Sequence, residues 1–171
     1  MTTRLELIPL QRFPLVEPGD DLVQLIVDAL SDNALVMEEG DVLVVAQKIV
    51  SKAENRYARL ADVNVSAEAL ALAARADKDP RQVQLILQES REVLRVRPGV
   101  IIVEHRNGYV HANAGIDKSN ILRDADDPRV LLLPIDPDAS ALALRRGLEE
   151  CTGIAPQVII NDSMGRAWRN G

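Results

Sequence analysis

The chain has 171 residues, which is enough for one domain with a real hydrophobic core. Its net charge of -6 and its aromatic content of 2% argue against a basic or base-stacking nucleic-acid surface, so no nucleic-acid partner is expected. One cysteine and two histidines are too few soft ligands for a structural zinc site, so any metal should be a hard cation bound by oxygens. No apolar run approaches the roughly 18 residues of a membrane span, and no signal-peptide core is present, which predicts a cytoplasmic protein without membrane contact.

The N-terminal part predicts a strand, a helix and a second strand. Arg4–Leu10 alternates weakly and favours a first strand. After a turn-rich stretch, an amphipathic helix is expected to begin at Asp20 or Asp21, whose carboxylate suits an N-cap. Val42–Ala46 is a short, continuous apolar run, which is typical of a strand buried on both faces.

The remainder of the chain mixes helices and strands. Helices are predicted over Ser66–Arg75, Asp79–Ser90 and Asp138–Cys151, the last with Leu142 on its inner face. Strands are predicted over Val93–Val96, Val100–Glu104, Tyr109–Ala112, Val130–Pro134 and Gln157–Ile160. Because these elements do not alternate as βαβ units, the expected fold class is α+β, with mixed β-sheets and flanking helices.

A first oxygen-rich segment, Asn113–Asn120, follows a predicted strand. Asp117 has amide and hydroxyl oxygens close by, including those of Ser119 and Asn120, and such oxygens suit a magnesium-type ion. Gly115 allows a close backbone approach. The same composition also fits a polar surface turn, because Asx-rich turns are common.

A second segment, Asn161–Arg169, continues from the last predicted strand. Asp162 and Ser163 place a carboxylate and a hydroxyl at the carboxyl end of that strand, where open sheets bind ligands. Arg166 and Arg169 could grip a phosphate or a carboxylate with their guanidinium forks. The alternative is a structural Asp cap followed by arginines that face the solvent.

A third segment, Gln47–Lys52, follows the strand over Val42–Ala46. Lys48 and Lys52 are four residues apart, so both could meet phosphates from one helical face, although an ordinary solvated face has the same pattern. The sequence has no Gly-x-x-x-x-Gly-Lys-Ser/Thr element and therefore no P-loop.

Taken together, the order and spacing of five motifs resemble the coenzyme F420-0:L-glutamate ligase (gamma-glutamyl ligase) family over essentially the whole chain. The motifs are Phe13–Val16 with Gly19–Leu22, Gly40–Ala46 with Val50–Glu54, Ala112–Asn120, Leu133–Ala141 and Asp162–Arg169. The resemblance implies a family-specific ligase fold without a P-loop, over a domain of residues 1–171. Family members continue past the last motif, so this polypeptide is expected to be truncated at its C-terminus.

The resemblance also implies an activity and its participants. A GTP-dependent ligase would add L-glutamate to the deazaflavin coenzyme precursor through an acyl phosphate, as a homodimer, with Mg²⁺ or Mn²⁺ and K⁺ as a further candidate cation. By position, the nucleotide contacts are Phe13, Pro14, Leu15, Val16, Gln47, Lys48, Lys52 and Asn120, and the metal ligands are Asp117, Asp162 and Ser163. Arg166 and Arg169 are the candidates for holding a substrate carboxylate.

Two other functions stay open from the sequence. One is a non-catalytic nucleotide-binding or dimerisation module of the same fold, which the missing C-terminal segment favours. The other is a related amide ligase that uses a different acceptor, because no residue pattern identifies the deazaflavin pocket.

Overall fold

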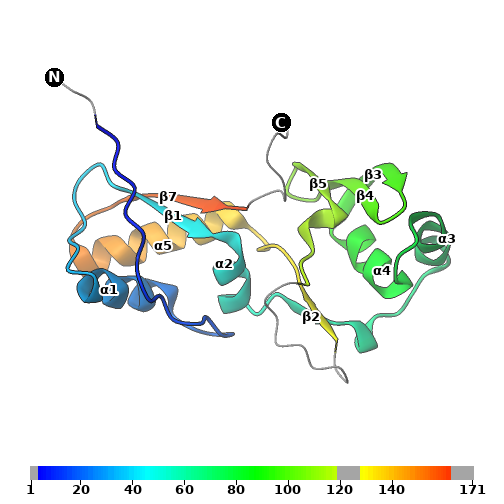
Figure 1. Ribbon diagram of the computed structural model, residues 1–171, viewed down its shortest axis with the longest axis horizontal. Coiled ribbons are helices and arrows are strands. Elements are labelled where there is room, and N and C mark those ends of the chain that lie inside the picture. The colour runs from blue at the N-terminus through cyan, green and yellow to red at the C-terminus, as the bar shows by residue number, and fades with distance from the viewer. Residues whose placement is uncertain (1–3, 119–127, 163–171) are drawn as a thin grey trace.

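A computed structural model describes residues 4–118 and 128–162 and shows an α+β protein, as predicted (Figure 1). The helices are α1 (Leu22–Asp32), α2 (Gln47–Ala53), α3 (Ala67–Ala76), α4 (Pro80–Gln88) and α5 (Pro137–Thr152), with 3-10 turns η1 (Leu60–Asp62) and η2 (Asn113–Gly115). The strands are β1 (Val42–Ala46), β2 (Tyr57–Arg59), β3 (Ser90–Arg97), β4 (Val100–His105), β5 (Val110–Ala112), β6 (Arg129–Leu131) and β7 (Gln157–Asn161). In the described ranges the strands form three small sheets, in the orders β1-β7, β2-β6 and β3-β4-β5.

The elements α1, β1, α2, α5 and β7 form a first lobe around one hydrophobic cluster (Figure 1). The Asp21 carboxylate caps α1 by accepting hydrogen bonds from the N–H groups of Val23 and Gln24. Gly147 of α5 lies against Val23, where an added Cβ would be 2.5 Å from Val23 Cγ2. A residue without a side chain therefore lets α5 pack closely on α1.

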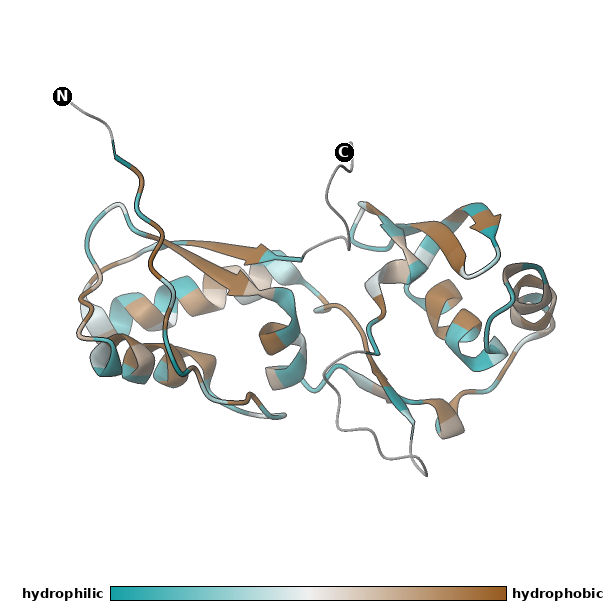
Figure 2. Ribbon diagram, viewed as in Figure 1, coloured by the Kyte–Doolittle hydropathy of each residue, from teal (hydrophilic) through white to brown (hydrophobic). Residues whose placement is uncertain are grey.

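The parallel pair β1–β7 is covered by helices on one face only. Leu43 and Val45 point into the cluster of the first lobe, whereas Val42, Val44 and Ile159 are exposed on the outer face. Figure 2 shows both strands as strongly hydrophobic. The expectation that Val42–Ala46 is buried on both faces is therefore wrong for the described residues.

The elements α3, α4, β3, β4 and β5 form a second lobe around a separate cluster. The antiparallel meander β3-β4-β5 presents Ile101 and Val103 to the two helices, and both side chains are buried. Burial alternates along β4, as expected for a sheet with one covered face.

The antiparallel pair β2–β6 lies between the two lobes (Figure 1). Arg56, just before β2, accepts a backbone hydrogen bond from Leu132 and donates through Nε to the carbonyl of Leu133. Its Nη2 atom also lies 3.1 Å from Glu89 Oε2, at the end of α4. Glu89 receives Arg106 Nη2 at 3.1 Å as well, so one buried carboxylate joins the β2–β6 connection to the second lobe.

Three local expectations differ from the structure. Arg4–Leu10 is not a strand, and Leu5 and Leu7 are exposed, because no neighbouring strand in the described chain pairs with this segment. The short strand β2 was not predicted, and Leu142 on α5 is exposed rather than inside. No helix within the described ranges is both long and apolar enough to cross a bilayer.

Candidate functional site

The candidate site begins at the carboxyl end of the parallel pair β1–β7. Ala46 pairs in register with Asn161, so the residues that follow them, Gln47 and Asp162, leave the sheet at the same edge. The helix α2 starts directly at Gln47, which brings Lys48 to this edge in its first turn. Carboxyl ends of parallel strands are a common place for ligands, since loops and helix starts converge there.

Asp117 reaches this edge from the second lobe through a constrained turn. Asn113, Ala114 and Gly115 have φ values of 52°, 53° and 69°, which is a run of left-handed backbone. At Gly115, an added Cβ would lie 2.6 Å from Leu133 Cδ1, so this position needs glycine for space as well as for its dihedral angle. Consecutive strained residues of this kind are often found at functional sites.

The backbone of Asp117 is fixed immediately after the turn. Its N–H donates to the carbonyl of Leu131, and its own carbonyl accepts from the N–H of Leu131, both at 2.9 Å. Its carboxylate Oδ2 lies 2.5 Å from Lys48 Nζ. The pair is partly exposed and joins the two lobes at the end of β1.

Asp162 makes a second contact between the lobes. Its Oδ2 atom lies 3.1 Å from Nε2 of His111, a residue of β5. The other ring nitrogen, Nδ1, lies 3.0 Å from the carbonyl oxygen of Ala112. The Asp162 carboxylate is an acceptor, so the contact between the lobes is a hydrogen bond when Nε2 carries the ring proton.

His111 belongs to a short series of rings in the second lobe. The rings of His105 and Tyr109 are parallel with centroids 5.1 Å apart, and Tyr109 meets His111 edge-on at 6.3 Å. Burial raises the pKa of Tyr109, and the carboxylates of Asp162 and Glu89 raise it further, against a hydrogen bond from Asn107 that lowers it. The phenol beside the site is therefore held in its protonated form.

Glu89 lies at the other end of this ring series. Burial alone would raise its pKa, but the His105 imidazole and the charges of Arg106 and Arg56 outweigh burial and hold the pKa below its usual value. His105 Nδ1 accepts the N–H of Asn107, which leaves Nε2 as the ring donor, 3.7 Å from Glu89 Oε2. His105 and Glu89 thus form a buried support for the rings near Asp162.

The other predicted nucleotide contacts in the described chain lie on the first lobe. Val16 is buried in its core, whereas Pro14 and Leu15 are exposed and Phe13 is half-buried. Gln47 is buried and donates through Nε2 to Ser51 Oγ at 2.6 Å, and Lys52 is half-buried. The structure does not test a nucleotide role for any of them.

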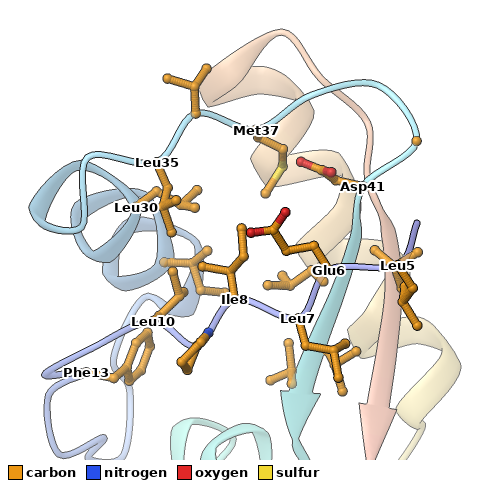
Figure 3. Close-up of a pocket in the computed structure, with 18 of the residues that line it drawn as sticks. Leu5, Glu6, Leu7, Ile8, Leu10, Phe13, Leu30, Leu35, Met37 and Asp41 are labelled. Atoms are coloured by element: carbon orange, nitrogen blue, oxygen red, sulfur yellow. The ribbon is translucent and has the colours of Figure 1, made fainter. Parts of the chain in front are cut away.

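Phe13 also lines an apolar groove between the N-terminal segment and β1 (Figure 3). Leu10 and Ile8 gather there with Leu30 and Leu35 from α1 and the loop after it, as Figure 3 shows. Among the predicted nucleotide contacts that the structure describes, Phe13 alone lines this groove, and most of the other lining side chains are aliphatic, so the chemistry of the groove is that of an apolar surface rather than a phosphate site.

Four predicted site residues lie outside the described residues: Asn120, Ser163, Arg166 and Arg169. Their roles remain predictions.

The oxygens at the edge of β1–β7 are of the kind that a hard divalent cation binds. Asp117 and Asp162 supply carboxylate oxygens, and each lies against a nitrogen donor of the opposite lobe, Lys48 for Asp117 and His111 for Asp162. Among residues 4–118 and 128–162, no group of three His, Cys, Asp or Glu side chains is close enough to hold a metal alone. A cation at this edge would therefore share its coordination with other oxygens, and phosphate oxygens are suitable ligands.

Sequence reasoning missed two residues of this site. The sequence assigned no role in the site to His111 or Tyr109, yet His111 contacts Asp162, and the ring of Tyr109 meets that of His111 edge-on. The available signal was the position of His111 on the strand that leads into Asn113–Asn120. No periodicity or spacing could show that this strand lies near the end of β7, since the two strands belong to different sheets and meet only in the folded chain.

Comparison with known proteins identifies the family. The family model described as F420-0:Gamma-glutamyl ligase matches residues 11–171. Proteins named coenzyme F420:L-glutamate ligase are similar over nearly the whole chain. The one from Methanothermobacter thermautotrophicus is 45% identical over 167 residues, which cover 98% of this chain and 65% of the relative. The one from Methanopyrus kandleri is 46% identical over 170 residues, which cover 99% of this chain and 63% of the relative.

A third relative, from Archaeoglobus fulgidus, is 44% identical over 168 residues, which cover 98% of this chain and 64% of the relative. The chain thus spans somewhat less than two thirds of the length of these relatives. The match of the family model and the level of identity are sufficient to classify it. The chain belongs to the F420-0:gamma-glutamyl ligase family.

Proposed function

We propose that the chain acts in a GTP-dependent ligase that joins L-glutamate to a carboxylate of the deazaflavin coenzyme precursor. The observation that carries this proposal is that the Lys48–Asp117 ion pair forms at the carboxyl end of β1–β7, the same sheet edge at which Asp162 follows β7. The names of the relatives, which pair coenzyme F420 with L-glutamate, support a form of this coenzyme and L-glutamate as the two groups that are joined.

The chemistry of amide formation explains why such a site is needed. An oxygen of the precursor carboxylate attacks the γ-phosphorus of GTP, GDP leaves, and an acyl phosphate forms. The amine of L-glutamate then attacks the acyl carbon, and inorganic phosphate leaves. Phosphoryl transfer depends mainly on positioning and on neutralisation of charge, so the protein must supply cations and a fixed geometry.

The proposal gives each candidate residue a role. Asp117, Asp162 and Ser163 hold Mg²⁺ or Mn²⁺, which would neutralise the phosphate oxygens when bound. Lys48 and Lys52 neutralise the triphosphate, with Gln47 and Asn120 as further nucleotide contacts and Phe13–Val16 near the base. Arg166 and Arg169 hold a substrate carboxylate as guanidinium forks do.

The proposal also includes a cytoplasmic homodimer and K⁺ as a further cation. A dimer is supported by the outer face of β1–β7, where Val42, Val44 and Ile159 are exposed apolar side chains that a second copy could cover.

The experiment uses the chain as it is, with two readouts. Incubation with GTP, Mn²⁺, the coenzyme precursor and L-glutamate is followed by mass spectrometry for a glutamylated product. Equilibrium binding of GTP with and without Mg²⁺ is measured on the same preparation, and light scattering of that preparation reports the dimer. We expect Mg²⁺-dependent GTP binding and a glutamylated product.

Asp117→Asn is the decisive variant, and Asp32→Asn, at an exposed position on α1, is its matched control. Asp117→Asn should lower Mg²⁺-dependent GTP affinity by at least about tenfold, because a neutral amide binds a hard cation far less well than a carboxylate. Asp32→Asn should bind as the unmodified chain does. Undiminished binding in Asp117→Asn would remove this residue from the site. GTP binding without any product would instead support a nucleotide-binding module.

A further inference from the structure

We propose that His111 is a positioning residue that holds the Asp162 carboxylate in the orientation a divalent cation needs. This inference rests on the proposed function, because it takes Asp162 as a cation ligand. The inference adds a residue of the second lobe to the site. This residue acts by orienting Asp162 and not by contacting the substrate.

The two predicted carboxylate ligands differ in how firmly the backbone holds them. The backbone of Asp117 is held in place by two hydrogen bonds with the backbone of Leu131. Asp162 follows the last residue of β7, and its side chain is 31% exposed. A carboxylate beyond a strand end has several accessible rotamers, so a fixed side-chain partner decides which one it adopts.

His111 is suited to be that partner because its own ring is fixed. Its side chain is only 10% exposed, and it lies on β5, where its backbone pairs with Val103 of β4. Nδ1 is engaged with the carbonyl of Ala112, and the edge of Tyr109 packs against the ring. The ring therefore has little freedom, and Nε2 points at Asp162 from a defined place.

The contact also leaves the carboxylate able to bind a cation. His111 Nε2 meets Oδ2, and a carboxylate has lone pairs on both of its oxygens, so Oδ1 can turn toward the end of β1–β7. Hydrogen bonds to a ligating carboxylate from outside the coordination sphere orient it, and their loss commonly lowers metal affinity 10- to 100-fold.

The test compares variants that keep or remove the donor at Nε2. In His111→Phe, the ring and its packing on Tyr109 remain, but neither nitrogen is present. In His111→Gln, an amide N–H can reach toward Asp162. Mn²⁺ alone is the probe, titrated into the chain while electron paramagnetic resonance reports the free ion.

We expect His111→Phe to raise the Kd for Mn²⁺ by about 10- to 100-fold, and His111→Gln to stay within about threefold of the unmodified chain. If the residue acts through Asp162, adding His111→Phe to Asp162→Asn should cause no further loss. An Mn²⁺ affinity in His111→Phe equal to that of the unmodified chain overturns the proposal. So does an equal loss in His111→Phe and His111→Gln, which would indicate a structural role.

Melting temperatures of all variants separate folding from positioning, since a structural role lowers the melting temperature without the rescue by Gln. If His111→Phe does not fold, His111→Asn replaces it, because that amide is too short to reach Asp162. Failure of the proposed function looks different: the unmodified chain would then bind neither Mn²⁺ nor GTP. Failure of this inference alone leaves both of those activities intact and insensitive to position 111.

Discussion

The buried side chain of Glu89 connects two parts of the molecule, the β2–β6 pair and the second lobe. Its carboxylate is 7% exposed and lies at 3.1 Å from both Arg56 and Arg106, at the place where the β2–β6 connection meets the second lobe. Removing one member of a buried charged group leaves the others without compensation, which costs far more than the net gain from forming the group.

We therefore expect Glu89→Gln to lower the free energy of unfolding by about 2 to 3 kcal/mol at neutral pH, somewhat less than for a fully buried pair, because Arg106 is 35% exposed. Urea unfolding followed by circular dichroism measures this. Glu104→Gln is the control, since Glu104 pairs with Arg91 on the surface of the same lobe and its loss should cost at most about 0.5 kcal/mol. Equal costs in the two variants would show that Glu89 does not join the lobes as argued.

At the scale of single residues, the sequence singled out three residues that the structure places at one edge of β1–β7, but it missed a residue that contacts one of them. Asp117, Asp162 and Lys48 were expected to act together, and the structure brings the first near Lys48 and the second to the same sheet edge. It could not predict His111, because a histidine on a strand has no local signal for a contact with a residue on another sheet.

Elements with strong local signals were predicted correctly. The helix α1 has an Asp cap and apolar residues at helical spacing, α4 and α5 each begin with Asp-Pro, and all three occur close to their expected bounds. The errors in assigning whole elements concern strands: β2 has only Tyr57–Arg59 and exists through its pairing with β6, while Arg4–Leu10 alternates but pairs with no strand among the described residues. A strand depends on another segment, whereas a capped helix is encoded mainly in itself.

The turn η2, which ends two residues before the proposed cation ligand Asp117, yields a prediction about stability. Gly115→Ala should destabilise the protein more than Gly99→Ala, although both positions have positive φ. At Gly99 no atom lies within 4 Å of an added Cβ, so that variant carries only the dihedral cost of about 1 to 2 kcal/mol. At Gly115 the added Cβ meets Leu133 at 2.6 Å, which should add about 1 to 3 kcal/mol.

The difference between these variants in urea unfolding isolates the steric contribution. The same Gly115→Ala protein should bind Mg²⁺ and GTP less well than Gly99→Ala, because Asp117 follows the turn directly. Identical unfolding free energies for the two variants would mean that Leu133 moves aside without cost.

For the whole molecule, carboxylates with lowered pKa values predict acid sensitivity. The hydrogen bond from Arg81 lowers the pKa of Asp79, and the pKa of Glu89 is lowered as well, against the effect of burial. A carboxyl group with a lowered folded pKa stabilises the protein fully above its ordinary pKa and loses this contribution as the pH falls through the folded value. The ordinary values are 4.5 for Glu and 3.8 for Asp, so stability should decline as the pH falls below 4.5.

Unfolding free energies measured across the acidic range test this expectation. Glu89→Gln should show a shallower decline below pH 4.5 than the unmodified chain, since one of the two titrating groups is gone. A parallel decline in both proteins would assign the acid sensitivity to other carboxylates.

The parallel pairing of β1 with β7 determines the stage of folding at which the candidate site forms. The two strands are separated by more than a hundred residues, and the second lobe lies between them in the chain. Closing so long a loop carries an entropic cost, and contacts between distant segments form slowly in folding. The cluster of the second lobe is built from consecutive elements and can collapse early, whereas the first lobe is completed, and Asp162 meets His111 and the edge of β1, only when β7 has docked. Cation binding would then report the last step of folding. The rate at which bound Mn²⁺ appears during refolding would measure the rate at which β7 docks on β1.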